Sequence, residues 1–219
     1  MKSTKKEFLV FGGTGSIGSE CIKSLGSHGK VHQLPKDELE LGGQLAGLPP
    51  LDGVLWAQGL NLNDSITDVD IDSFQRIMEA NVLFILKTAN ILTKLKKLKN
   101  GCQLVVIGSM WAHLSRPSKL SYSTSKAACL AVVRSLAVDL GPYGIQANSI
   151  SPGPIDSPMT RRSLIQEQLE RIIAETPLNR LITMNEVTSI IVEFMQGSMS
   201  GITGQDILID AGWSVSKLV

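Results

Sequence analysis

The stretch "FLVFGGTGSIGSE" (residues 8–20) decides the fold class of this 219-residue chain. Residues 8–11 are a short apolar run that stops at glycines, as a fully buried strand does. From Ile17 to Leu25 the apolar residues follow helical spacing, and Gly26 and Gly29 end that helix. A buried strand that passes through a glycine loop into a helix is the first unit expected of an α/β fold.

Strand-like and helix-like segments alternate along the rest of the chain. Apolar runs predict strands near residues 30–34, 53–57, 103–109, 145–153 and 205–212. Helical spacing predicts helices from residue 70 to about 99 and over 121–136, 164–174 and 186–195. Because the strands are continuous apolar runs, we expect a doubly wound parallel sheet between two helix layers, three layers in all. No repeat or linker divides residues 1–219, so we expect one domain.

Composition argues against several classes of protein. The net charge is +1, which favours neither nucleic acid nor an anionic membrane as partner. No apolar run approaches the roughly 18 residues that cross a bilayer, and the N-terminus does not have the pattern of a signal peptide. Cys21, Cys102 and Cys129 lie far apart, without metal-like spacing, and are expected to be reduced and buried. We therefore expect a cytoplasmic protein without a metal site.

The glycine loop is suited to binding a dinucleotide. Gly12, Gly15 and Gly18 would let the backbone turn tightly and approach a pyrophosphate at the helix N-terminus. Thr14 and Ser16 could add hydroxyl donors. The alternative is a tight turn without a ligand. After the second strand comes Lys36 rather than an acid, although Asp37 and Glu38 are close. A base at this place pairs with a 2′-phosphate, so we expect NADP(H) to be favoured over NAD(H).

A serine, a tyrosine and a lysine form the second constellation. Ser109 follows a predicted parallel strand, at the end where such sheets bind ligands. Tyr122 and Lys126 are four residues apart and share one helix face. An ordinary phenol has a pKa of about 10, and a neighbouring ammonium lowers such a pKa and so favours proton transfer. The alternative is that both side chains only extend from a packed helix to solvent. With a dinucleotide nearby, the set suits reduction of a ketone or oxidation of an alcohol.

These motifs resemble the short-chain dehydrogenase/reductase family over nearly the whole chain. The matching stretches are "GGTGSIG" from Gly12, "ANV" around Asn81, "GSM" with Ser109, "YSTSK" from Tyr122, "SPGPIDSPM" from Ser151, "PLNRLITMNEV" from Pro177 and "GQDILIDAG" from Gly204. The resemblance implies a Rossmann-like sheet. It makes Tyr122 the general acid/base, Lys126 the ligand of the nicotinamide ribose, and Ser109 the group that orients the substrate oxygen.

The resemblance also assigns residues around the cofactor. Asn81 would hold a water that joins Lys126 to solvent; on its apolar stripe it could equally be a core asparagine satisfied by partners. The nicotinamide would lie against Pro152, Gly153, Ile155 and Ser157. The remaining cofactor contacts would come from Ile17, Ala57 and Gly59, in addition to the glycine loop.

The chain departs from the family's pattern in three ways. Phe11 stands where the family usually has Thr, and "WAQG" (residues 56–59) stands where it usually has Asn-Asn-Ala-Gly. Ser16 replaces the middle glycine of the commonest loop. The chain is also short between strands 2 and 4, which we attribute to a flanking helix. The segment 156–184 corresponds to the family's substrate lid, and there Arg161 and Arg162 are either solvated or face an acidic substrate.

The leading hypothesis is an NADP(H)-preferring ketoreductase that acts on a small carbonyl or alcohol. One alternative is a non-catalytic NADP(H) sensor or scaffold of the same fold, and another is a lyase or isomerase. We also expect a homodimer or homotetramer. The helices over 70–99 and 121–136 have apolar residues beyond one stripe, which a partner subunit would cover: Leu83, Phe84, Leu86, Val132 and Val133.

Overall fold

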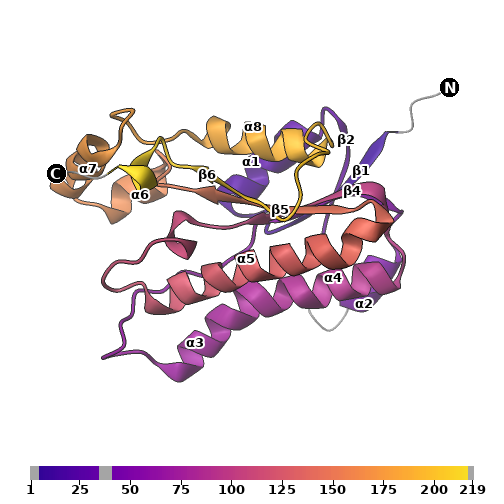
Figure 1. Ribbon diagram of the computed structural model, residues 1–219, viewed down its shortest axis with the longest axis horizontal. Helices are drawn as coiled ribbons and strands as arrows, with labels where there is room; N and C mark the ends of the chain where they lie inside the picture. The colour runs from indigo at the N-terminus through magenta and orange to yellow at the C-terminus, as the bar shows by residue number, and fades with distance from the viewer. Residues whose placement is uncertain (1–4, 35–40, 217–219) are drawn as a thin grey trace.

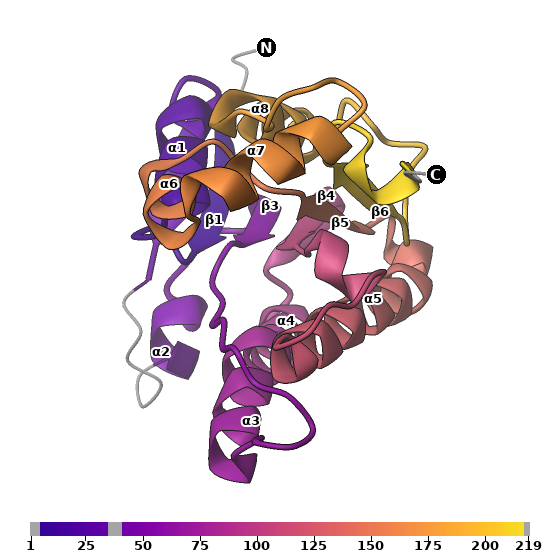
Figure 2. The same ribbon diagram turned by 90° about the vertical axis from the view of Figure 1, so that its left-hand side faces the viewer.

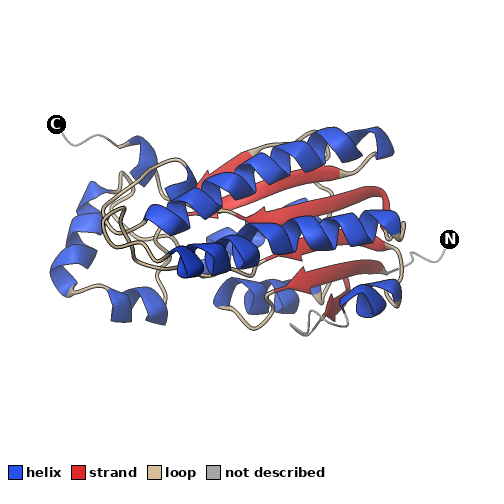
Figure 3. Ribbon diagram, turned by 90° about the horizontal axis from the view of Figure 1, so that it is seen from below, coloured by secondary structure: helices blue, strands red, loops and turns tan. Residues whose placement is uncertain are grey.

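A computed structural model describes residues 5–34 and 41–216 of the chain. Its centre is a parallel sheet of six strands in the order β2-β1-β3-β4-β5-β6. The strands are β1 (Lys6–Phe11), β2 (Gly29–Gln33), β3 (Leu51–Trp56), β4 (Leu98–Ile107), β5 (Gln146–Pro152) and β6 (Asp206–Ile209). All strands point the same way, so their carboxyl ends meet at one edge of the sheet (Figure 3).

Helices cover both faces of the sheet, which confirms the predicted three-layered, doubly wound α/β fold (Figure 1). One face is covered by α1 (Ser16–Leu25) and α8 (Met184–Met195). The other is covered by α2 (Leu41–Ala46), α4 (Phe84–Lys94) and α5 (Leu120–Leu140). Three further helices extend from these layers: α3 (Ile71–Met78), α6 (Pro158–Ser163) and α7 (Gln166–Glu175).

Each face of the sheet has its own hydrophobic core. Along β1, Phe8 and Val10 point to the α1 and α8 side, whereas Leu9 and Phe11 point to the α4 and α5 side. Successive side chains of a strand alternate between faces, so a strand buried on both sides must be apolar throughout. This is the physical reason why the run at residues 8–11 predicts a central strand.

Strand order places a crevice between β1 and β3. The connection after β1 leads to β2 on one side, and β3 then lies on the other side of β1. Ligands of open α/β sheets bind at such a switch point. Beyond β1 the described part of the sheet has β2 alone on that side, one strand fewer than the common Rossmann order 3-2-1-4-5-6. The expected shortening is therefore present, but among the described residues it removes a strand and not just part of a flanking helix.

The two substitutions relative to the family's pattern, at Phe11 and Trp56, are explained by packing. These residues are partners in the β1–β3 register, and their rings stack at 5.9 Å. The ring of Phe84 contacts Phe11 edge-on at 5.2 Å, and Trp56 Nε1 donates to Thr88 Oγ1 at 2.8 Å. The three aromatic side chains therefore form one cluster next to the switch point, and its polar side-chain atom, Trp56 Nε1, is hydrogen-bonded.

The prediction of one continuous α-helix from residue 70 to about 99 is wrong in two respects. This stretch of helix is α3 and α4 joined by a π-helical turn over Glu79–Leu83, and it ends at Lys94. Lys96 has a φ of 52°, which turns the chain into β4. In the sequence "KLKKLKNG" (residues 94–101), Lys94 is the exposed end of α4, and the residues from Lys97 on have partners in the fold. Lys97 donates to the carbonyl oxygens of Ala46 and Leu48, and Lys99 pairs with Asp52 at 2.7 Å.

The segment after β5 leaves the sheet and later comes back to its own starting point, where two backbone hydrogen bonds join its two ends. Asp156 N donates to Ile182 O at 2.7 Å, and Ile182 N donates to Pro154 O at 3.3 Å. Between these bonds lie α6 and α7, which cross the end of the molecule where the strands finish (Figure 2). Arg161 forms a two-bond ion pair with Asp156, at 2.6 and 2.8 Å, so part of the arginine pair already has a carboxylate partner.

The cysteines and the apolar helix faces test two further expectations. Cys21, Cys102 and Cys129 are free and buried, as predicted. Val132 and Val133, expected to need a partner subunit, are instead buried in the core of the chain itself. Leu83 and Leu86 are each 42% exposed.

In the part of the chain that the structure describes, no helix combines the length and the apolar character that crossing a bilayer requires.

Candidate active site

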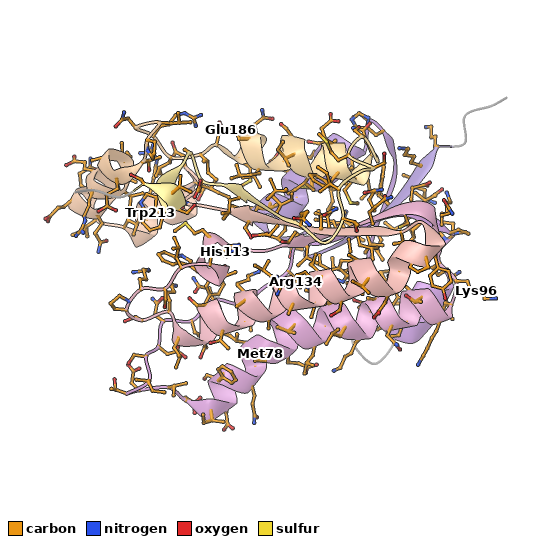
Figure 4. The ribbon with its side chains drawn as sticks, viewed as in Figure 1. Met78, Lys96, His113, Arg134, Glu186 and Trp213 are labelled. Carbon is orange, nitrogen blue, oxygen red and sulfur yellow. The ribbon has the colours of Figure 1, made fainter. Side chains whose placement is uncertain are left out.

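The candidate site lies at the edge where the strands end. His113 and Trp213, which follow β4 and β6, both lie toward that end, whereas Lys96, which precedes β4, lies at the opposite end (Figure 4). The residues predicted for catalysis follow the same plan. Ser109 comes directly after β4, Tyr122 and Lys126 lie in the first two turns of α5, and Asn81 lies in the π-helical turn.

Tyr122 and Lys126 share one face of α5, as their spacing predicts. Lys126 Nζ lies 5.9 Å from the centre of the Tyr122 ring and donates to the Ile107 carbonyl oxygen at 2.7 Å. The side chain is only 4% exposed. An ammonium has three donors, and among the described residues Lys126 uses one of them, so two remain for a ligand.

The side chain of Asn81 lies close to Lys126 because the helix has a π-turn at Asn81. Its amide nitrogen donates to Leu60 O at 3.0 Å and to Ser125 Oγ at 2.9 Å, and its Oδ1 accepts from Leu60 N at 2.7 Å. A Cβ on Gly59 would lie 3.2 Å from Asn81 Oδ1 and 3.6 Å from Lys126 Nζ. Asn81 therefore has the partners that a buried amide needs and also fixes the chain beside Lys126. π-Turns are frequent at functional sites.

The thiol of Cys129 completes this cluster. It donates to the Asn81 carbonyl oxygen at 3.1 Å. Burial raises the pKa of the Cys129 thiol, against the opposing effect of the nearby Lys126 charge. The thiol is thus held in its protonated form, in which it can donate to the π-turn.

Ser109 is buried and has an extended backbone at the start of a short 3-10 turn (Met110–Ala112). Among the residues that the structure describes, its Oγ accepts one long bond, 3.3 Å from Trp111 N, so the hydroxyl keeps a donor for a substrate oxygen. The turn packs against α5, which brings Ser109 to the helix of Tyr122.

Beside this turn, the Trp111 and Trp213 rings meet edge-to-face at 5.7 Å. A pocket of about 350 Å³ lies next to Trp213, between Leu114, Arg171 and Glu175.

A loop over residues 59–64 connects these parts. Asp64 accepts from Ser121 N at 2.9 Å and also from the Ser121 hydroxyl, and so caps α5 from a distant part of the chain. Lys119, the residue before α5, donates to Asn61 Oδ1 and Asn63 Oδ1, both at 2.7 Å. The 59–64 loop thus holds the N-terminus of α5 and the π-turn together.

The glycine loop has the expected form. Gly12 has a φ of 76°, and a Cβ there would lie 2.4 Å from Gln58 N. A Cβ on Gly18 would lie 2.3 Å from Gly12 O. These two glycines are therefore required by packing within the chain. A Cβ on Gly15 would meet only Gly12 O at 3.4 Å, so within the described residues packing does not require that glycine. Thr14 and Ser16 are exposed beside it, and Ile17 is partly buried.

The residues present fit a dinucleotide. Gly15 is the N-cap of α1, no side chain caps that helix, and its first turn has no acidic residue, which suits a phosphate at the N-terminus. Both amide atoms of Gln58, which follows β3 beside the loop, are buried without a partner among the described residues. A buried amide without partners is costly, so a ligand that bonds to it would bind favourably. Ala57 and Gly59 flank Gln58.

Four predicted cofactor residues lie at or after the end of β5, beginning with Pro152, its last residue. A Cβ on Gly153 would lie 2.7 Å from Asp210 Cβ, so the turn after Pro152 packs tightly against the chain after β6. Ile155 bridges to Ile182 at the base of the 156–184 segment. Ser157 caps α6, its Oγ accepting from Thr160 N at 3.2 Å. Lys36 lies outside the described residues, so the predicted phosphate contact has no structural account.

Three residues of the site were not singled out in the sequence. Gln58 lies within the unusual "WAQG" stretch, and that departure from the family's pattern was the available signal. Lys119 is a buried lysine three residues before Tyr122, which helical spacing would place near the ring. Trp213 follows the last strand, and its Nε1 is buried without a partner among the described residues.

Comparison with known proteins agrees with this geometry. A family model described as enoyl-(acyl carrier protein) reductase matches residues 45–214. An uncharacterized oxidoreductase of Bacillus subtilis (strain 168) is 30% identical over 165 residues, covering 75% of this chain and 67% of that protein. Cyclopentanol dehydrogenase of Comamonas sp. (strain NCIMB 9872) is 28% identical over 174 residues, covering 78% and 69%.

Solved structures share the fold. A gluconate 5-dehydrogenase from Burkholderia cenocepacia J2315 in complex with NADP and tartrate has a TM-score of 0.87 at 16% identity, covering 98% of this chain and 97% of that chain. The family model spans most of this chain, and the parallel sheet between two helix layers agrees with it. The chain is therefore an oxidoreductase of the short-chain dehydrogenase/reductase family, whose members bind nicotinamide cofactors.

Proposed function

We propose that the chain interconverts a ketone and a secondary alcohol with a nicotinamide cofactor. One observation carries the proposal. Lys126 is buried, lies 5.9 Å from the Tyr122 ring, and has donors that no described residue uses. A structural lysine at this depth would be expected to have all its donors bonded within the protein.

The proton is handled by Tyr122. In reduction its hydroxyl donates a proton to the carbonyl oxygen as the hydride arrives at the carbonyl carbon, and in oxidation the phenolate removes the hydroxyl proton. The positive charge of Lys126 stabilises the phenolate. The Ser109 hydroxyl donates to the substrate oxygen and holds it at the phenol. The bound cofactor supplies or accepts the hydride.

Other residues hold the cofactor. The uncapped N-terminus of α1, with Thr14, Gly15 and Ser16, receives the pyrophosphate. The two unused donors of Lys126 suit the nicotinamide ribose. Pro152, Gly153, Ile155 and Ser157 line the nicotinamide, with Ala57, Gly59 and the Gln58 amide beside the glycine loop. Segment 156–184 would then close over the substrate as a lid.

The proton-transfer role is tested by Tyr122→Phe. Only a hydroxyl is lost, so cofactor binding, measured by thermal shift with NAD, NADP and their reduced forms, should persist. Turnover should fall about 10²-fold or more, which is the usual contribution of a positioned acid or base. Cyclopentanol and cyclopentanone are suitable probes because a relative is named cyclopentanol dehydrogenase. Near-normal turnover of a confirmed substrate by Tyr122→Phe would rule out this mechanism.

NADP(H) is proposed as the preferred cofactor because Lys36, rather than an acid, follows β2. The NADP complex of the Burkholderia structure supports the choice at the level of the fold. A charge-assisted contact with the 2′-phosphate corresponds to roughly tenfold or more in affinity. Titration of NADP and NAD against the wild type and Lys36→Ala should show a selective loss of NADP affinity in the variant. Equal affinities in the wild type would contradict the preference.

A homodimer or homotetramer remains the proposed assembly. Leu83 and Leu86 project from the α4 side at 42% exposure, and Val138 of α5 is 75% exposed. Packing these faces against a symmetry mate would remove apolar surface from water. Light scattering at micromolar concentration should give a multiple of the 23.6 kDa chain mass. A mass equal to that of one chain would refute it.

A further inference from the structure

Two ammonium groups flank the Tyr122 ring. Lys126 lies one helical turn after Tyr122, with its Nζ 5.9 Å from the ring centre. Lys119 lies one turn before it, with its Nζ 5.4 Å from the ring centre. Both lysines are buried, at 4% and 5% exposure. The family resemblance assigns a role to Lys126 alone, so the second buried cation needs its own explanation.

The partners of Lys119 leave its charge largely uncompensated. Its Nζ donates to two neutral side-chain oxygens, those of Asn61 and Asn63. The nearest carboxylate in its surroundings, Asp64, is engaged with the N-terminus of α5 through Ser121. Burial and the repulsion from Arg116 lower the pKa of Lys119, and the attraction to Asp64 opposes them as the smallest of the three effects. A negative charge that develops beside this ammonium would therefore be stabilised by it.

The phenol oxygen of Tyr122 is the group on which that charge develops in the proposed reaction. Lys119 Nζ already donates to Asn61 Oδ1 and Asn63 Oδ1, so the 59–64 loop fixes its position. We propose that Lys119 is a positioning residue for Tyr122: it anchors the 59–64 loop through Asn61 and Asn63 and places a second positive charge beside the ring. The inference rests on the proposed function, because it assigns the proton transfer to Tyr122.

The charged groups around Tyr122 come from three segments. Lys126 belongs to α5, Lys119 and Arg116 to the segment that leads into α5, and Asp64 to the 59–64 loop. Arg116 is exposed and stacks over Trp111 at 5.4 Å, so water screens its effect on the phenol. Removal of the Lys119 charge leaves Lys126 as the ammonium beside the ring.

The chain offers a direct measurement, because it contains only two tyrosines, Tyr122 and Tyr143. Tyr143 is 65% exposed, and Tyr143→Phe leaves Tyr122 as the sole tyrosine. With carbon-13 at the ring Cζ, one NMR resonance then reports ionisation of the Tyr122 phenol in the full-length protein, without substrate. Three further substitutions are introduced one at a time into the Tyr143→Phe protein: Lys119→Gln, Lys119→Arg and the control Arg116→Gln. Circular dichroism and thermal melting check that each variant is folded.

Lys119→Gln removes the charge and keeps a donor for the two asparagines. The titration midpoint of the resonance should move up by about one pH unit, as expected for loss of a charge at this distance in a partly screened site. Lys119→Arg should restore the background midpoint, and Arg116→Gln should move it by less than about a third of the Lys119→Gln shift. An unchanged midpoint in folded Lys119→Gln, or an equal shift in Arg116→Gln, would overturn the inference. Shifts as expected in a protein that oxidises no alcohol would instead refute the proposed function.

Discussion

Apart from the unpartnered Trp213 Nε1 and Ser123 Oγ and the unused donors of Ser109 and Lys126, the two halves of the proposed cofactor cleft differ in how far the described residues satisfy their own polar groups. In the catalytic half, Asn81, Asp64 and Lys119 bond to backbone and side-chain partners from segments far apart in sequence. In the dinucleotide half, α1 has no side-chain cap and Gln58 has an amide without partners among the described residues.

This difference indicates which half is formed before a ligand arrives. Proton transfer depends on groups held in a fixed geometry, and hydrogen bonds within the protein provide that geometry without the ligand. Binding of an anionic group instead benefits from donors that have no other partner, because their desolvation is then offset by the ligand. Asn81 and its partners should therefore respond to mutation mainly through stability, and Gly15 and Gln58 mainly through affinity for the cofactor.

Asn81→Ala should give the largest effect on stability. It removes three hydrogen bonds, one of them the buried bond to Ser125 Oγ, and takes from Leu60 N–H and C=O the side chain to which they bond, so we expect a loss of about 3 kcal/mol in the free energy of unfolding. Denaturant unfolding measures this loss. Asn90→Ala, at an exposed position of α4, is the matched control and should change stability by less than about 0.5 kcal/mol. Equal stability of the two variants would break the comparison on the catalytic side.

A pair of glycine variants separates packing from ligand binding within one loop. Gly18→Ala should destabilise the free protein by about 1–3 kcal/mol, because its Cβ would lie 2.3 Å from the Gly12 carbonyl oxygen. Gly15→Ser should keep or raise stability, since its hydroxyl can cap α1, while it takes the place proposed for the pyrophosphate. Thermal melts with and without NADP distinguish the two. A Gly15→Ser protein that binds NADP as the wild type does would place the pyrophosphate elsewhere.

Gln58→Met should give the smallest change in the free protein and a clear change in binding. Replacing an unpartnered buried amide by an apolar side chain of similar size removes an unsatisfied group, so the melting temperature should stay the same or rise. NADP affinity should fall about tenfold, as expected for the loss of one ligand hydrogen bond. Gln75→Met on the exposed face of α3 is the control for the change in side chain. Lower stability with unchanged affinity would show that Gln58 serves packing rather than the ligand.

Much of the fold could be predicted from local patterns. The strand at residues 8–11, the glycine loop and the helix after it follow from apolar runs and glycine positions, which act over a few residues. Tyr122 and Lys126 could be paired because helical spacing fixes their relation. The long helix could not be divided correctly, because the π-turn at Asn81 depends on its bonds to Leu60 and Ser125, contacts between segments distant in sequence.

The sequence by itself therefore determined the three-layered fold, through apolar runs and helical spacing, and the family, through the resemblance of its motifs. It also predicted Ser109, Tyr122 and Lys126 as one set. Only the tertiary structure decided that Val132 and Val133 belong to the core, that Phe11 and Trp56 form one stack, and that Lys119 bonds to Asn61 and Asn63. It also decided which polar groups have partners, at Asn81, and which do not, at Gln58. The physical reason is that burial and hydrogen bonding between distant segments depend on how the elements pack, which no local pattern of residues contains.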